Sequence, residues 1–172
     1  VDVYQCEYNC RDVDVVKYFQ NTKKIDHNKI KMVIISESLP KKIDDYFDGE
    51  KTPSFIANTN YLFNNNGCNF KTYSDDLKNG IYLTTALKCV KKDYLVSALT
   101  IENCSYNLEK EIGIFNNLRV VLLMGDLSIK SINYIWKRKY NQRIIPNGPT
   151  YKIRNKEYIN NGIKFITSYT HT

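Results

Sequence analysis

The stretch Lys31-Met-Val-Ile-Ile-Ser-Glu-Ser-Leu-Pro40 decides the fold, because it joins an unbroken apolar run to a polar segment that carries a carboxylate and a proline. Residues 32–35 show no polar alternation, which predicts a strand covered on both faces, as at the centre of a parallel sheet. Residues 36–40 are then predicted to form a turn at the carboxyl end of that strand, where open α/β sheets bind ligands. Glu37 is therefore a candidate catalytic acid, and a solvated turn acid is an equally open interpretation.

Three further apolar runs of similar length predict strands at residues 81–87, 118–124 and 163–168. Helical spacing of apolar residues over 101–115 puts Cys104 on a buried stripe, with Thr100 as the expected N-cap, and Asp126 is expected to cap the next helix. Part of 41–79 must also be helical, because a parallel crossover needs a covering element.

The remaining segments show weaker patterns. Residues 12–19 suggest a short helix, and residues 143–158 suggest a loop or an irregular β element. Together with the four strands, these patterns predict an α/β fold, a three-layer α/β/α sandwich around a four-stranded parallel sheet. We expect a single domain over residues 1–172, in which residues 1–29 form an N-terminal extension with a pair of cysteines.

Composition restricts the function classes. The formal charge of +7 would attract a polyanion such as DNA, although a solvated basic surface explains the charge about as well. No run approaches the ~20 apolar residues of a membrane span, so we expect a cytoplasmic, monomeric protein with no membrane partner. In that compartment disulfides are unexpected, so the five cysteines are interpreted as metal ligands or as buried residues.

In this order, the segments resemble the iron-sulfur branch of the uracil-DNA glycosylase superfamily. The similarity extends over residues 31–168. It lies in four matching segments: Ile34-Ile-Ser-Glu-Ser-Leu-Pro40, Leu83-Thr-Thr-Ala-Leu-Lys-Cys89, Glu102-Asn-Cys104 and Val121-Leu-Leu-Met-Gly-Asp126. The resemblance implies a DNA repair enzyme that rotates uracil or another deaminated base out of the stack and hydrolyses its N-glycosidic bond.

The resemblance also assigns roles to individual residues. Glu37 would position the attacking water or stabilise the positively charged sugar, and an aromatic ring would stack on the base. The implied base pocket comprises Ser36, Phe47, Phe55, Thr85 and Ser168, with Tyr46 as a further aromatic candidate. Core packing is an equally open interpretation for each phenylalanine.

Two positions depart from the family pattern. Thr85 stands where the family commonly has an asparagine that reads the base edge, and Ile166 stands where it has a histidine facing the departing base. His171 would replace that histidine only if the chain folded back. These departures favour a second hypothesis, a nucleic-acid-binding module that keeps the fold without the chemistry. An unrelated small-molecule enzyme on a similar sandwich is a third hypothesis.

The cysteine spacing resembles that of the same branch. Fourteen residues separate Cys89 from Cys104, as in the last two cluster ligands of the branch, and Cys6 and Cys10 would supply the first pair. The resemblance thus implies a [4Fe-4S] cluster held by four thiolates, with Cys68 left over. The first pair has three intervening residues where the branch normally has two, and Cys104 fits equally well as a small buried residue.

Overall fold

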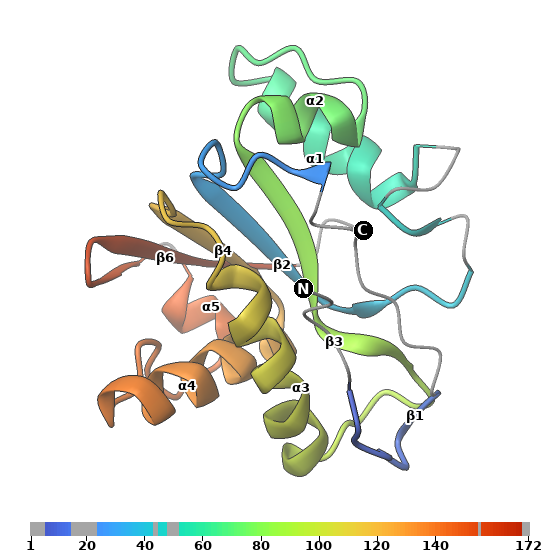
Figure 1. The fold of residues 1–172 in the computed structure, drawn as a ribbon, viewed down its shortest axis with the longest axis vertical. Coiled ribbons are helices and arrows are strands. Elements are labelled where there is room, and N and C mark those ends of the chain that lie inside the picture. The colour runs from blue at the N-terminus through green and yellow to red at the C-terminus, as the bar shows by residue number, and fades with distance from the viewer. Residues whose placement is uncertain (1–5, 15–23, 43–44, 48–51, 155, 170–172) are drawn as a thin grey trace.

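The computed structural model describes residues 6–14, 24–42, 45–47, 52–154 and 156–169, and its elements form one mixed α/β unit around a six-stranded sheet (Figure 1). The strand order is β1-β3-β2-β4-β6-β5. The elements are β1 (Val13–Asp14), β2 (Met32–Leu39), α1 (Ser54–Asn64), α2 (Tyr73–Lys78), β3 (Ile81–Lys91), α3 (Ala98–Ile112), β4 (Val120–Met124), α4 (Asp126–Tyr140), α5 (Thr150–Ile153), β5 (Glu157–Asn160) and β6 (Ile163–Ser168).

The four predicted strands form the parallel centre of the sheet, as β3, β2, β4 and β6. The predicted total of four strands is wrong, because β1 and β5 add antiparallel edges. β5 joins β6 through Asn161 and Gly162, whose φ values of 50° and 75° are those of a tight two-residue hairpin. The segment 143–158, predicted as a loop or irregular β element, therefore contains α5 and the start of this hairpin.

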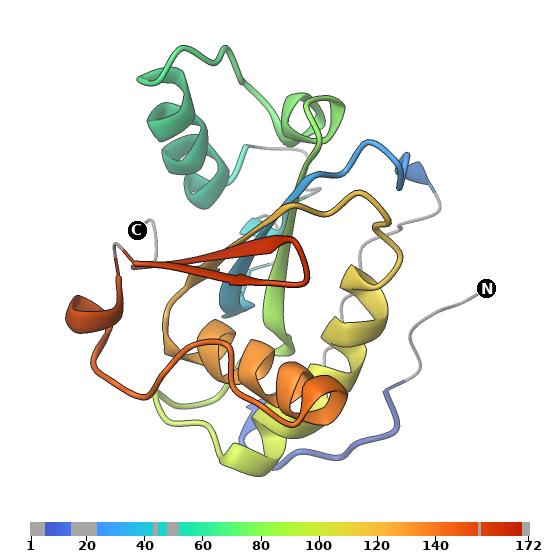
Figure 2. The same ribbon diagram turned by 90° about the vertical axis from the view of Figure 1, so that its left-hand side faces the viewer.

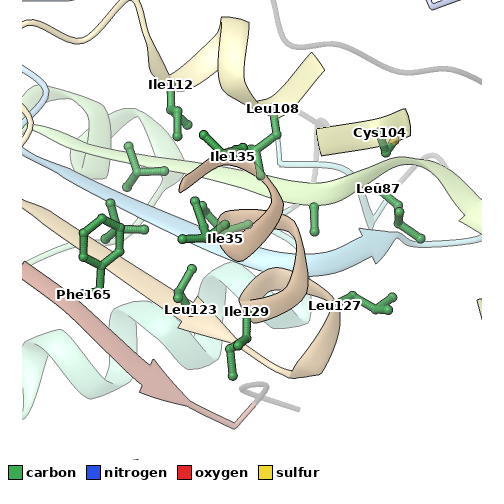
Figure 3. Close-up of a cluster of buried hydrophobic side chains, with 14 of the residues drawn as sticks. Ile35, Leu87, Cys104, Leu108, Ile112, Leu123, Leu127, Ile129, Ile135 and Phe165 are labelled. Atoms are coloured by element: carbon green, nitrogen blue, oxygen red, sulfur yellow. The ribbon is translucent and has the colours of Figure 1, made fainter. Parts of the chain in front are cut away.

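Helices cover both faces of the sheet, as Figure 2 shows with α1 and α2 on one side and α3 and α4 on the other. Adjacent residues of β2 point to opposite faces: Ile35 belongs to the core cluster under α3 and α4, and Ile34 to the cluster under α1 and α2. Figure 3 shows Ile35 with Leu108 of α3 and Ile135 of α4. The double covering predicted from the unbroken apolar run is confirmed, as is the helical content expected within residues 41–79.

A buried polar network ties β3 to α3, and the sequence did not predict it. Lys88 and Glu111 form an ion pair, with side chains that are only 3% and 2% exposed. The Tyr82 hydroxyl donates to Glu111 Oε1 over 2.6 Å, and the Thr84 hydroxyl donates to the same atom over 2.9 Å. Lys88 Nζ also donates to the carbonyl of Thr85 over 2.7 Å. Because both charges have hydrogen-bonded partners, the network can be buried at an acceptable desolvation cost.

Three local predictions need correction. The side chain that caps α3 is Ser97, which accepts the amide of Thr100, so Thr100 lies inside the first turn. The N-cap of α4 is Gly125, with Asp126 as the first helical residue. Val13–Asp14 pairs with β3 as a strand, where a helix over 12–19 was predicted, and residues 15–19 lie outside the described part of the chain.

None of the helices in the described ranges combines the length and the apolar character needed to cross a bilayer.

Candidate functional site

The segment formed by residues 34–40, the first of the four that resemble the glycosylase family, lies mostly in β2 and extends beyond the last residue that β2 pairs with in β4. β2 pairs with β4 only as far as Ile35, whereas β3 continues beside it until Leu39 lies opposite Val90. The predicted turn at 36–40 is therefore wrong, because residues 36–39 remain in the strand, with a register shift between Ser38 and Leu39. The end of β2 thus lies beside the start of α4 and leaves the side chain of Glu37 there.

Glu37 is held from two sides. Lys91 Nζ lies 3.0 Å from Glu37 Oε2, and the backbone amide of Leu127 in the first turn of α4 donates to Oε1 over 3.4 Å. Gly125 has no side chain to cap the helix, and a Cβ placed there would lie 2.6 Å from Glu37 Oε1. The carboxylate therefore occupies the space that the glycine leaves open, where the positive end of the helix dipole favours negative charge.

The same carboxylate lines a cavity of about 410 Å³ at the carboxyl ends of β2 and β3. This volume is within the range of small-molecule sites. The rings of Phe47 and Phe55 lie with their centroids 5.6 Å apart. The lining residues are Ser36, Glu37, Ser38, Leu39, Pro40, Asp45, Phe47, Pro53, Ser54, Phe55, Asn58 and Lys91. Two acids, two aromatic rings and a cation therefore share one cavity.

Two predicted pocket residues do not line this cavity. The Thr85 side chain is buried, and its hydroxyl donates to the carbonyl of Leu87 over 2.7 Å. Ser168 ends β6 opposite Met124, and its carbonyl accepts the amide of Gly125 over 3.1 Å. Ser168 therefore supports the turn under Glu37 through its backbone.

The alternative aromatic residue, Tyr46, is buried with Leu39 and Val90, where burial raises the pKa of its hydroxyl. His171 lies outside the described residues.

Sequence reasoning missed two charged residues of the cavity, Lys91 and Asp45. Lys91 belongs to a lysine doublet that reads as basic surface, and it lies 54 positions from Glu37 in the chain. No local pattern marks either residue. A possible signal was the length of the apolar segment after residue 81, since a strand that continues to Lys91 brings that side chain level with the end of β2.

The four cysteines implied as cluster ligands line a single small cavity, although they come from distant parts of the chain. Cys6 and Cys10 approach it from the N-terminal segment, Cys89 from β3 and Cys104 from α3. Four thiolates are the donor set of a [4Fe-4S] cluster, so the residues fit the group in kind. The cavity offers only about 10 Å³, room for about one water molecule.

The four cysteines therefore line one cavity, but their side chains are not arranged to hold a cluster as they stand. Among the residues that the structure describes, no three of the types His, Cys, Asp and Glu lie at metal-binding separations. The sulfur of Cys104 accepts the backbone amide of Lys88 over 3.2 Å, and burial raises the pKa of its thiol. Cys68 packs against the core cluster on the opposite face of the sheet, away from this cavity.

Comparison of the chain with protein-family models and with curated proteins found no match.

Proposed function

We propose that the protein is a DNA N-glycosylase that removes uracil or another deaminated base by hydrolysing the N-glycosidic bond. The observation that carries the proposal is the shared cavity, in which the Glu37 carboxylate lies with the rings of Phe47 and Phe55. It lies at the sheet edge where α/β folds bind ligands, within the layered arrangement expected from the sequence. The formal charge of +7 agrees with a polyanionic substrate.

The chemistry needs negative charge where the sugar becomes positive and a flat surface for the base. In the proposed complex the base enters between the cavity walls and stacks on Phe47 or Phe55. The Glu37 carboxylate then faces the sugar and either orients the attacking water or stabilises the cation. Lys91 and the α4 amide keep this carboxylate in one orientation, so little reorganisation is needed during the reaction.

A second candidate function is a nucleic-acid-binding module without catalysis. The observation that favours it is that Glu37 already has two structural contacts, to Lys91 and to the start of α4, and so resembles a helix-capping residue. The Thr85 hydroxyl is also taken up by a backbone carbonyl and does not line the cavity. A base entering that cavity would therefore not meet it.

We also propose that Cys6, Cys10, Cys89 and Cys104 hold a [4Fe-4S] cluster with a structural role. The cluster would link the N-terminal segment to β3 and α3, where these thiols already line one cavity. Its loading requires the segments that carry the thiols to rearrange, because the cavity as it stands is too small for the cluster.

The test is base release from single- and double-stranded DNA containing uracil, hypoxanthine or xanthine, with normal DNA as control. The proposal expects release from at least one modified DNA and its loss in Glu37→Gln. Binding that weakens steeply with salt, without release of any base, would instead support the binding module. Release that is unaffected by Glu37→Gln would refute the role assigned to that residue.

A further inference from the structure

A second cavity lies against α3 and α4. It is lined by residues of α3, α4 and α5 and of the segment 143–148, together with Val96. Its volume is about 380 Å³, which is within the range of small-molecule sites, and it shares no lining residue with the Glu37 cavity. It is therefore a site distinct from the proposed base pocket.

The buried part of this second cavity is apolar, and we call it the floor. Ile101 of α3, Ile129 of α4 and Ile153 of α5 form the floor, and each of these residues is almost completely buried. Tyr134 of α4 adds an aromatic side chain that packs against the core cluster under α3 and α4. Such a surface suits a flat, weakly polar group, because contact with that group would remove apolar area from water.

One buried side chain holds the wall that follows α4. Asn133 donates to the carbonyl of Ile145 over 3.0 Å, and its side-chain oxygen accepts the amides of Ile144 and Ile145 over 3.1 and 3.0 Å. Asn133 is only 8% exposed, so these bonds are shielded from water. The segment 143–148 is therefore fixed against α4, and Arg143 begins it.

The charged side chains that line this cavity do not balance. Asp126 pairs with Lys130 over 2.6 Å, so these two charges offset each other. Lys137 and Arg143 also line the cavity, and no ion pair joins either of them to an acid in the described part of the chain. Arg143 contacts Asn147 through one guanidinium nitrogen, which leaves further N–H donors for a ligand.

Acids elsewhere on this side do not cancel the excess. Asp12 reaches Ser97, between the lining residues Val96 and Ala98, but its two side-chain oxygens already accept the Ser97 amide and the Thr100 hydroxyl. Glu109 of α3 is paired with Arg138 and Lys139 of α4. Neither of these acids lines the cavity, nor does Asp93. The cavity therefore keeps two unpaired cations beside an apolar floor.

The order of side chains along α4 places the aromatic group next to a cation. Lys130, Tyr134 and Lys137 follow one another at spacings of four and three residues, so they lie on one face of the helix. Lys137 belongs to the last turn of α4, and Arg143 follows shortly after the helix ends. The two unpaired cations thus lie toward one end of the cavity, beyond Tyr134.

We propose that this cavity binds a nucleoside monophosphate unit, with the phosphate on Lys137 and Arg143 and the base against Tyr134 and the floor. A phosphate monoester carries a charge close to −2 at neutral pH, which complements two cations. The unit is either a free nucleotide or a nucleotide within a DNA strand, since both offer the same chemistry. The inference does not depend on the proposed glycosylase activity, because the two cavities share no residue.

The test measures dissociation constants for dAMP, adenosine and inorganic phosphate by isothermal titration calorimetry. We expect dAMP to bind at least about tenfold more tightly than adenosine or phosphate, because each of these supplies only half of the contacts. Lys137→Gln/Arg143→Gln should weaken dAMP binding about tenfold or more. Both residues are exposed, so these substitutions leave the core intact.

Two further variants separate charge from space. Lys71→Gln/Lys78→Gln removes the same net charge beside and at the end of α2, which covers the opposite face of the sheet (Figure 2), and it should leave dAMP binding unchanged. Ala98→Trp places a large side chain at the exposed start of α3, where Ala98 lines the cavity, and it should abolish binding without any change of charge. Urea unfolding checks that each variant is folded.

Absence of saturable dAMP binding to the wild-type protein would overturn the inference. Equal affinity in Lys137→Gln/Arg143→Gln or in Ala98→Trp would overturn it too, as would inorganic phosphate bound as tightly as dAMP. Once dAMP binds as expected, an unmodified single-stranded oligonucleotide identifies the source. It displaces dAMP if the cavity holds a nucleotide of a strand and leaves dAMP bound if the cavity serves a free nucleotide. Base release through Glu37 is tested separately and is unaffected by either result.

Discussion

The contact between Gly125 and Glu37 gives a sharp prediction for the variant Gly125→Ala. Gly125 has φ 89° and ψ 171°, a region open almost only to glycine, so alanine costs about 1–3 kcal/mol in backbone strain. The new Cβ would also meet Glu37 Oε1 at 2.6 Å and Cγ at 2.7 Å. Since a real Cβ does not approach so closely, the carboxylate must leave the start of α4.

Displacing the Glu37 carboxylate also removes two favourable electrostatic contacts, which lowers the free energy of unfolding further. The charge at the helix terminus contributes about 0.3–1 kcal/mol, and the partly exposed pair with Lys91 contributes up to about 1 kcal/mol. Gly67→Ala and Gly162→Ala are matched controls, because both glycines have positive φ and nothing within 4 Å of a new Cβ. We therefore expect Gly125→Ala to lower the free energy of unfolding by about 0.3–2 kcal/mol more than either control.

Urea unfolding of the three variants measures the difference, and base release is measured in parallel. Gly125→Ala should lose activity although Glu37 is still present, whereas the two controls should keep theirs. Equal stability losses in all three variants, with activity retained, would refute the inferred packing of Glu37 against the glycine.

Three further predictions concern stability and the thiols. Lys88→Met and Glu111→Leu should each lower the free energy of unfolding, measured in urea, by about 3–5 kcal/mol, and the double variant should lower it by less. The reason is that a single buried charge without its partner is less favourable than no buried charge at all. Single variants as stable as the wild type would contradict this. Burial raises the pKa of Asp76 to about 7, so between about pH 4 and 7 the folded protein holds a proton on Asp76 that the unfolded chain has released. The free energy of unfolding should therefore fall as the pH rises from about 4 to 7. This dependence of stability on pH should be weaker in Asp76→Asn. Cys104→Ser should abolish iron and sulfide in anaerobically purified protein while Cys68→Ser leaves both unchanged, and a colourless wild-type protein would exclude the cluster.

The parallel centre of the sheet was predictable because a strand covered on both faces must be apolar throughout. Ile34 and Ile35 show this, since each belongs to a different core cluster. The edges were missed for two reasons. β1 has only two residues and therefore no periodicity. The β5–β6 hairpin did carry a signal in Asn161-Gly162, but these two residues fall between the segment 143–158, interpreted as a loop or irregular β element, and the predicted strand at 163–168, and the signal was missed.

The candidate site was predictable only in part. The resemblance named Glu37, Phe47 and Phe55, which the structure brings to one cavity. Lys91 was missed, because its position depends on how far β3 extends beside β2 and on the register shift near Leu39. Thr85, expected in the base pocket, does not line the cavity for a related reason: the strand places its side chain in the interior, where its hydroxyl donates to a backbone carbonyl.

The most direct measurement of the central claim is the single-turnover rate of base release for Glu37→Gln beside Asp45→Asn. Both acids line the same cavity, and only Glu37 lies against the start of α4. If the Glu37 carboxylate acts on the sugar or its water, Glu37→Gln should slow release by about 10²–10⁴-fold and Asp45→Asn should change it little. Equal rates for Glu37→Gln and the wild-type protein would contradict the account.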